Sequence, residues 1–307
     1  MTAAVLTSCR DTYRDALIAA MAEDNRLVCL DSDTGLFLGR DFGPAAGRYL
    51  NLGIAEQNLL GAAAGLARSG RIPFVNTMAT FASTRALETV KIDLAYANLP
   101  VRIAATHGGL SAGNLGPTHH SLEDLAIMRL LPNMTVLVPA DSAATVALFE
   151  QCRELPGPVY LRLGRIATPE LPVAAAPIRI GQAQILRQGS DVLLVCCGPH
   201  PVLLSLQAAE ALAERGIQAA VLNMHTVKPL DELALAGSRP VVTVEEHWRS
   251  GGLGGAVAEA LAETGRRVLR VGVPDRFVSM AGDQQYLLDR CGVSVPAIQD
   301  AVLRALA

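Results

Sequence analysis

Residues 51–61 read NLGIAEQNLLG, and we expect them to begin a helix that spans residues 55–67. Small and apolar residues dominate this helix, and Ser69-Gly70 end it. Glu56 lies in its first turn among apolar neighbours. There it can serve the helix macrodipole, which favours acidic groups at helix N-termini. A carboxyl group in apolar surroundings can equally share a proton with the nitrogen of a heterocycle, so both interpretations stay open.

On both sides of this stretch, short apolar runs alternate with longer helical patterns, which is typical of a mainly parallel α/β sheet. In the first half we expect strands at 26–30, 72–76, 100–105, 135–138 and 159–163, and helices at 11–24, 55–67, 87–96, 122–130 and 143–153. In the second half we expect strands at 191–197, 218–223, 240–245 and 267–271, and helices at 201–215 and 254–264. Asp141 is expected to cap the helix at 143–153.

The composition changes between the two halves. Residues 167–177 contain three prolines and three consecutive alanines, which is typical of a stiff, extended linker. A chain of 307 residues is long enough to form two full cores. The sequence therefore predicts two α/β domains, at residues 1–166 and 181–307, joined by a linker at 167–180.

Composition and charge exclude several classes of protein. Hydrophobic residues make up 50% of the chain and charged residues 18%, which excludes a disordered chain or a coiled coil. A net charge of -3 provides no basic field for nucleic acid or an anionic membrane. No apolar run approaches the ~20 residues of a membrane span, and we expect no secretory signal. The six cysteines form no CxxC pair, so we expect reduced thiols, a cytoplasmic location and no zinc site.

Residues 106–124 read THGGLSAGNLGPTHHSLED and are rich in Gly, Ser and Asn. This composition predicts a long exposed loop between a strand and a helix, and such loops often carry function. The candidate functional residues are His107, His119 and His120. A metal site formed by these histidines is the less favoured interpretation, because no acidic partner stands near them at a fixed spacing.

Together these stretches resemble the thiamine-diphosphate enzymes, specifically the pyrimidine-binding domain of the transketolase family. The pattern continues at the family's spacing through Gly65, Gly70 and Thr80-Phe81. The resemblance implies that Glu56 contacts N1′ of the cofactor's aminopyrimidine ring and favours the imino tautomer that activates the thiazolium carbon. It also implies that Phe81 stacks on the aminopyrimidine ring.

The loop at 106–124 resembles the family loop that ends in a Gly-Pro-Thr-His phrase, here at residues 116–119. The resemblance implies that His107 and His119 line the substrate channel and bind sugar oxygens or phosphate. His120 stands where the family usually has glutamine.

Two arginines are matched with family residues that bind the substrate phosphate. Arg165 ends the stretch VYLRLGR and resembles one of them, with Arg162 as a competing candidate. Arg10, near the start of the domain, is matched with the other.

Two positions depart from the family pattern. Leu115 stands where full-length transketolases usually carry an aspartate that bonds a substrate hydroxyl, and Phe37 replaces a substrate-binding serine. A buried hydroxyl left without a partner costs roughly 1–3 kcal/mol. We therefore expect a sugar-type substrate with fewer hydroxyl groups than an ordinary sugar phosphate.

The second half contains VTVEEHWRSGGLGG at residues 242–255, in which Glu245, Glu246 and His247 look like a catalytic cluster. The resemblance places them in the family's C-terminal domain, which mainly supports the dimer, so we expect no direct chemical role. The glycines that follow open a helix and could hold an anion, although this signal alone is weak.

The motifs that would grip a cofactor's phosphates are missing. The sequence shows no GxGxxG after a strand, no P-loop, and no Gly-Asp-Gly phrase of the kind that binds Mg²⁺ and the diphosphate in thiamine enzymes. The resemblance covers only the last two of the family's three domains. It therefore implies a partner subunit that carries the diphosphate and Mg²⁺ site, in a dimer of heterodimers.

The resemblance implies the C-terminal subunit of a split transketolase, which moves a two-carbon ketol unit from a ketose donor to an aldehyde acceptor. One alternative is the β-type subunit of a 2-oxo acid decarboxylating complex, or a relative of deoxyxylulose-phosphate synthase. Another alternative is a non-catalytic α/β scaffold.

Overall fold

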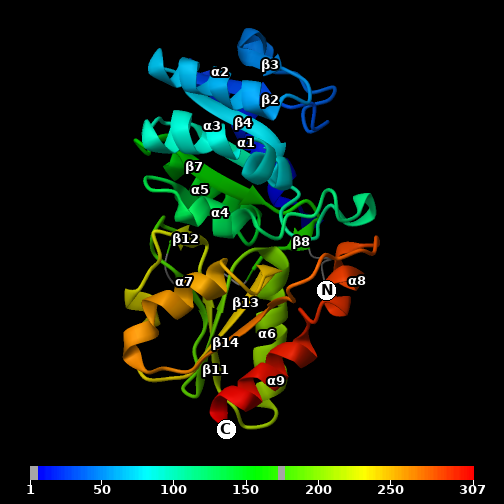
Figure 1. Cartoon of the computed structure of the whole chain (residues 1–307), viewed down its shortest axis with the longest axis vertical. Helices are drawn as coiled ribbons and strands as arrows, with labels where there is room; N and C mark the ends of the chain where they lie inside the picture. Colours follow the sequence, from blue (N-terminus) through cyan, green and yellow to red (C-terminus); the bar gives the residue numbers. More distant parts are fainter. Residues whose placement is uncertain (1–5, 172–176) are drawn as a thin grey trace.

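The computed structural model of the chain describes residues 6–171 and 177–307. Two α/β halves are stacked along the long axis of the molecule (Figure 1). The helices and strands of the first half are β1 (Leu6–Thr7), α1 (Cys9–Glu23), β2 (Leu27–Asp31), β3 (Tyr49–Asn51), α2 (Glu56–Arg68), β4 (Ile72–Met78), α3 (Leu87–Thr89), β5 (Arg102–Thr106), α4 (Asp124–Leu130), β6 (Thr135–Leu137), α5 (Ser142–Arg153), β7 (Val159–Leu163) and β8 (Thr168–Pro169). Those of the second half are β9 (Gln184–Arg187), β10 (Val192–Cys196), α6 (Pro199–Ala213), β11 (Ala219–Asn223), β12 (Thr226–Lys228), β13 (Val241–Trp248), α7 (Leu253–Ala260), β14 (Val268–Val273), α8 (Gln284–Arg290) and α9 (Val295–Leu306).

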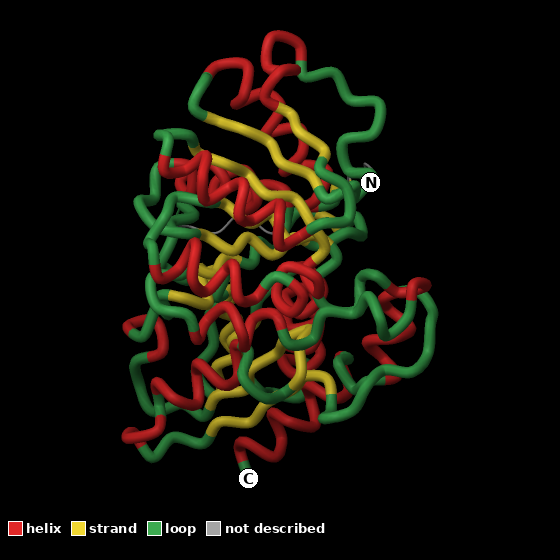
Figure 2. Tube along the Cα trace, turned by 45° about the horizontal axis from the view of Figure 1, so that its top comes forward, coloured by secondary structure: helices red, strands yellow, loops and turns green. Residues whose placement is uncertain are grey.

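The first half is built on a seven-stranded sheet with the order β12-β6-β7-β5-β4-β2-β3. Strands β2 to β7 pair in parallel, whereas β12 comes from the second half and pairs antiparallel with β6. Strands β2, β5 and β7 are buried at every position, as is typical of parallel strands covered by helices on both faces. Figure 2 shows these strands in the interior of the half, with helices outside them.

The second half contains a five-stranded sheet with the order β14-β13-β10-β11-β9. All of its pairs are parallel except β9 with β11. The two predicted α/β domains with mainly parallel sheets are therefore confirmed.

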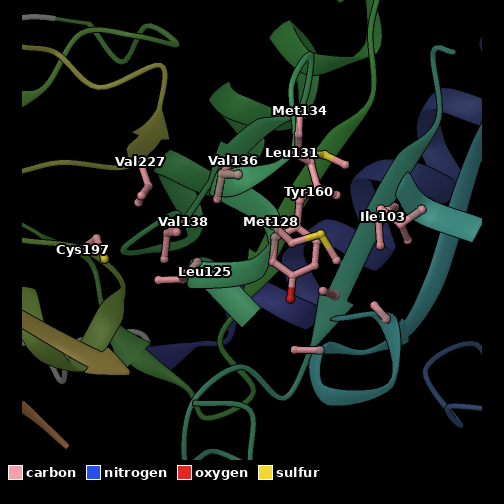
Figure 3. Packing of buried hydrophobic residues seen from close by; sticks show 14 of the residues in the cluster. Ile103, Leu125, Met128, Leu131, Met134, Val136, Val138, Tyr160, Cys197 and Val227 are labelled. Atoms are coloured by element: carbon pink, nitrogen blue, oxygen red, sulfur yellow. The ribbon is translucent and has the colours of Figure 1, made fainter. Parts of the chain in front are cut away.

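One hydrophobic core runs through both halves. Figure 3 shows side chains of α4, β6 and β7 that share this core with Cys197 and Val227 of the second half. Beside them, the Lys228 ammonium group donates hydrogen bonds to the carbonyl oxygens of Arg129 and Leu131, at the end of α4. Strand β12 thus fixes the second half to the first through backbone pairing, apolar packing and the hydrogen bonds of a half-buried amine.

Most predicted elements are present with small shifts at their ends. Asp141 caps α5 as predicted, because its carboxylate accepts a hydrogen bond from the Ala144 amide at 2.7 Å. The helix predicted at 87–96 is only partly α-helical, since Val90–Tyr96 form a π-helical segment (η3) rich in β-branched and bulky side chains.

Other elements were not predicted. Strands β3 and β12 have three residues each, too few to show a period, and β9, α8 and α9 were also missed. In the predicted linker, Thr168–Pro169 pair antiparallel with β1, while residues 172–176 lie outside the described residues. All six cysteines are buried and free. None of the helices in the described residues is long and apolar enough to cross a bilayer.

Candidate active site

The candidate residues follow the carboxyl ends of neighbouring parallel strands. Glu56 follows β3, Phe81 follows β4, His107 follows β5 and Arg165 follows β7. Ligands of open α/β sheets bind at this edge, because the loops after the strands converge there. The sheet therefore brings residues that are far apart in sequence to one end of its strands.

Glu56, Phe81 and a third residue, Arg85, form a contact group at this edge. Glu56 begins α2 and is only 2% exposed. The Arg85 Nη1 donates to the Glu56 Oε2 at 2.8 Å, and the Arg85 Cζ lies 4.4 Å from the centroid of the Phe81 ring. The two residues predicted to bind the aminopyrimidine thus contact the same flat cation.

A π-helical turn (η2, Phe81–Arg85) creates this arrangement. The Ala86 amide bonds to the Phe81 carbonyl oxygen at 3.2 Å, across five residues. The widened turn keeps Phe81 and Arg85 on one face, and such turns occur frequently at functional sites. Arg85 was missed from the sequence, because its spacing of four from Phe81 has meaning only within a helical turn, and no helix was predicted at residues 81–85.

His119 contacts Phe81 from another side. Their ring centroids are 5.4 Å apart, and the rings meet edge to face at 78°. The His119 Nδ1 lies 2.9 Å from the Thr118 hydroxyl. The end of the glycine-rich loop therefore reaches the aromatic side chain predicted to stack on the cofactor.

His107 is buried and has a left-handed backbone conformation with φ of 60°. This conformation is uncommon for a non-glycine residue and occurs often at functional sites. Burial lowers the pKa of His107 to about 3, and the positive charges of Arg165 and Arg10 act in the same direction. The imidazole is therefore neutral at physiological pH, and two guanidinium groups lie within electrostatic reach of it.

Arg10 reaches this edge because α1 begins beside the end of β7. The Arg10 amide donates to the Gly164 carbonyl oxygen at 3.1 Å, and its guanidinium lies 3.3 Å from the Asp11 carboxylate. Arg165 is the next residue along the chain from Gly164. Both predicted phosphate-binding arginines are half-buried and lie at the same end of the sheet.

Arg162, the competing candidate, has a structural role. It is 6% exposed and donates to Asp124 at 2.8 and 3.1 Å. It also donates to the carbonyl oxygens of Ser121 and Glu246, each at 3.0 Å. Because these acceptors already engage its guanidinium, Arg162 joins the loop to the second half.

The two positions that depart from the family differ in their surroundings. Leu115 is 49% exposed on the surface of the glycine-rich loop. Phe37 is 3% exposed and packs against Phe42 and Tyr49 with ring centroids 5.5 and 5.6 Å away. Phe37 is therefore a core residue of the first half, whereas the side chain at position 115 is open to solvent.

A pocket of about 330 Å³ lies between the two halves, beside Thr80 and the end of the glycine-rich loop. Its lining includes Thr80, His120 and Glu123 from the first half and Trp248 and Phe277 from the second. Burial raises the pKa of Glu123 above its usual range. Within residues 6–171 and 177–307, no three His, Cys, Asp or Glu side chains come together in a way that could hold a metal ion.

The acidic cluster of β13 is engaged within the fold. Glu245 accepts the backbone amides of Leu253 and Gly254, at 2.7 and 2.8 Å, and so caps α7. Glu246 accepts the Leu110 amide at 2.6 Å and the Gln284 side chain at 2.8 Å. These bonds engage Glu245 and Glu246 within the fold, and the absence of a direct chemical role stays a prediction.

Residues 7–170 match the family described as transketolase, pyrimidine binding domain, and residues 181–298 match transketolase, C-terminal domain. The chain belongs to the transketolase family. Its resemblance to this family in sequence and its two-domain fold are thereby confirmed.

Individual relatives agree with this assignment. The chain is 42% identical over 296 residues to the 6-deoxy-6-sulfo-D-fructose transketolase subunit SqwH of Clostridium sp., and the match covers 94% of this chain and 91% of that protein. It is 38% identical over 308 residues to 1-deoxy-D-xylulose-5-phosphate synthase of Gloeobacter violaceus, covering 96% of this chain and 47% of the synthase. The solved structure of a split gene transketolase, described as an inactive beta4 tetramer, has a TM-score of 0.86 and 41% identity, covering 97% of this chain and 98% of that one. This transketolase-family chain is accordingly a subunit of a transketolase-type transferase.

Proposed function

We propose that this chain is the C-terminal catalytic subunit of a split, thiamine-diphosphate-dependent transketolase. It transfers a two-carbon ketol unit from a ketose or ketose phosphate donor to an aldehyde-type acceptor. The observation that carries the proposal is the pairing of a buried carboxylate, Glu56, with the aromatic ring of Phe81 at the carboxyl edge of the sheet.

These residues fit an aminopyrimidine ring. The flat, delocalised guanidinium of Arg85 donates an N–H to Glu56 and lies on Phe81, which supports the fit of a ring with the same properties. Thiamine diphosphate, when bound, would supply a nucleophilic carbon for chemistry at the donor's carbonyl group. Glu56 would hold the proton at the ring's N1′, and Phe81 would fix the plane of the ring.

The remaining residues suit an anionic, hydroxylated substrate. Arg165 and Arg10 would bind its phosphate or another terminal oxyanion, since guanidinium groups match such anions geometrically. His107 stays neutral because its pKa is about 3, so it would exchange hydrogen bonds with sugar oxygens rather than carry a charge. His119, beside Phe81, would act on oxygens close to the reacting carbon.

The active enzyme would need a second polypeptide. The described residues contain no metal-binding group, and a relative of similar length is named as a transketolase subunit. We propose that the partner supplies the diphosphate and Mg²⁺ site, and that a dimer of heterodimers is the working assembly. The structural neighbour described as an inactive beta4 tetramer supports this need for a partner.

Leu115 supports a donor with fewer hydroxyl groups than an ordinary sugar phosphate. Its exposed apolar side chain cannot accept a hydrogen bond from a substrate hydroxyl. The Clostridium relative is named for a 6-deoxy-6-sulfo-ketose, in which a sulfonate replaces a phosphate ester. A sulfonate would suit the same arginines, so both anions belong in the donor panel.

The decisive experiment is a tagged pull-down of this chain from its own cells, with the partner identified by mass. The proposal expects a subunit that carries a Gly-Asp-Gly metal phrase, and two-carbon transfer by the reconstituted pair with ketose phosphate or sulfonate donors. If no partner is recovered and no thiamine diphosphate binds, the catalytic proposal fails and a scaffold role is favoured.

A second candidate is a reaction of the deoxyxylulose-phosphate-synthase type, favoured by the 38% identity to that synthase. Pyruvate as donor distinguishes the two reactions. Release of carbon dioxide from pyruvate, without transfer from ketoses, would select the second candidate.

A further inference from the structure

Arg85 stands where the proposed function requires the aminopyrimidine ring. Its guanidinium bonds to Glu56 at 2.8 Å and lies over Phe81 at 4.4 Å. The proposed cofactor ring needs the same carboxylate and uses the same aromatic side chain. A ring that bonds the same Glu56 oxygen and lies on the face of Phe81 that Arg85 covers would have to displace the guanidinium.

The guanidinium has the properties that allow it to take this place. It is planar and delocalised, stacks on aromatic faces and directs N–H donors within its plane. An aminopyrimidine ring that is protonated at N1′ presents the same combination to a carboxylate. Arg85 therefore satisfies Glu56 and Phe81 with the chemistry that the ring would bring.

Burial explains why Glu56 requires such a partner. Its side chain is 2% exposed, and a buried carboxylate without a counter-ion is strongly unfavourable. The Arg85 side chain is 45% exposed. The arginine can therefore swing into solvent without opening the core, whereas the glutamate cannot follow it.

We propose that Arg85 is an internal placeholder, which holds the charge of Glu56 and covers Phe81 in the free subunit and leaves both when the cofactor ring enters. This proposal rests on the proposed function. The placeholder competes with the cofactor, so the apparent affinity is reduced by the fraction of molecules in which Arg85 is paired. Binding of the cofactor therefore requires Arg85 to leave both its ion pair with Glu56 and its stacked position on Phe81.

The test compares three variants of the reconstituted complex. R85Q removes the charge and the rigid plane, and R85K keeps a charge but cannot stack as a flat group. R68Q is the matched control, because Arg68 is exposed at the far end of the helix that begins with Glu56. Binding of thiamine diphosphate in the presence of Mg²⁺ is measured by calorimetry, without turnover.

We expect R85Q to bind the cofactor about five- to tenfold more tightly than the unchanged complex, with R85K between them and R68Q unchanged. Weaker binding by R85Q would overturn the proposal, because it would show that Arg85 holds the cofactor. Equal binding would also overturn it, since Arg85 would then not compete.

Thermal unfolding gives a second readout. Without cofactor, R85Q should unfold a few degrees below the unchanged protein, because Glu56 loses its counter-ion. With saturating cofactor this difference should disappear, since Arg85 no longer contributes. A deficit that persists with cofactor would indicate that Arg85 is a permanent structural residue. If neither protein binds thiamine diphosphate, the proposed function itself fails, and the placeholder proposal fails with it.

Discussion

Glu56 of the first half and Glu245 of the second are both almost completely buried, at 2% and 0% exposure. Glu56 is the first residue of α2, whereas Glu245 belongs to β13 and contacts the start of α7. Their partners differ. Glu56 is held by the side chain of Arg85, whereas Glu245 is held by the backbone amides of Leu253 and Gly254. A side chain can rotate away and be replaced by a ligand, but amides at a helix N-terminus are fixed.

Burial alone therefore does not identify a catalytic carboxylate in this fold. Burial raises the pKa of Glu245, while the amides of Gly254 and Leu253 act in the opposite direction. That combination describes a helix cap rather than a proton-transfer group. The kind of partner separates the carboxylate that is available to a ligand from the one that holds the fold together.

The largest expected effect is that of Glu56→Gln on turnover. The amide is nearly isosteric but cannot share the N1′ proton, so we expect two-carbon transfer by the complex to fall by about 10²–10⁴-fold. Circular dichroism and the melting temperature should change little. Retained activity would show that Glu56 only serves the helix macrodipole.

The same substitution at Glu245 should lower the stability of the protein and leave its activity unchanged. Glutamine has one acceptor oxygen, so one amide of α7 would face an NH₂ group instead of an acceptor. We expect the free energy of unfolding to fall by about 2–3 kcal/mol. Chemical denaturation measures this change, and activity per folded molecule should be preserved. A stable but inactive variant would move Glu245 into the chemistry.

His247 and His107 differ in the same way as the two glutamates, and measuring stability at several pH values tests the difference. His247 bonds its two nitrogens to the Trp248 carbonyl oxygen at 2.7 Å and the Ala126 amide at 3.3 Å, both in the backbone. His107 has a hydroxyl partner, and burial lowers its pKa from 6.5 to about 3. The unfolded chain therefore binds the proton more tightly, so stability falls as the pH drops below 6.5 and the loss ends near pH 3.

At pH 5 this single group should lower stability by about 2 kcal/mol relative to neutral pH. We expect His107→Asn to reduce the loss, as measured by denaturant unfolding at several pH values. An unchanged pH dependence would show that the pKa of His107 is the same in the folded and the unfolded chain.

The smallest expected effect is that of Leu115→Asp, which creates an exposed carboxylate without a fixed partner. The site is 49% exposed, so stability should hardly change. A new hydrogen bond to a substrate hydroxyl should raise kcat/KM for an ordinary ketose phosphate by about two- to tenfold. If the unchanged enzyme already uses that donor well and the variant gains nothing, Leu115 does not select the substrate.

The long, buried elements were predictable, because their apolar runs and helical periods are local. Strand β7 and helix α2, for example, differ from the predicted ranges by at most one residue at either end. The Glu56–Phe81 pairing was inferred from a resemblance, and the structure brings Arg85 into contact with both. Arg85 itself was missed, because nothing in the local pattern indicates that residues 81–85 form a π-helical turn.

Contacts between the halves could not be predicted from local pattern either. Residues Thr226–Lys228 have no period of their own and become a strand only because β6 offers an open edge. Arg162 looked like a candidate ligand until its bonds to Asp124 and to the Glu246 carbonyl oxygen became visible. Such assignments depend on partners that are distant along the chain.

Strand β12 makes the two halves one unit for protein engineering. A chain cut after the first family domain would leave the backbone of β6 unpaired at a sheet edge, with Val136 and Val138 uncovered nearby. Unpaired edges of this kind favour self-association. Fusion, shuffling or separate expression should therefore treat residues 6–228 as inseparable, so the chain does not divide into exchangeable modules at its proline-rich connection.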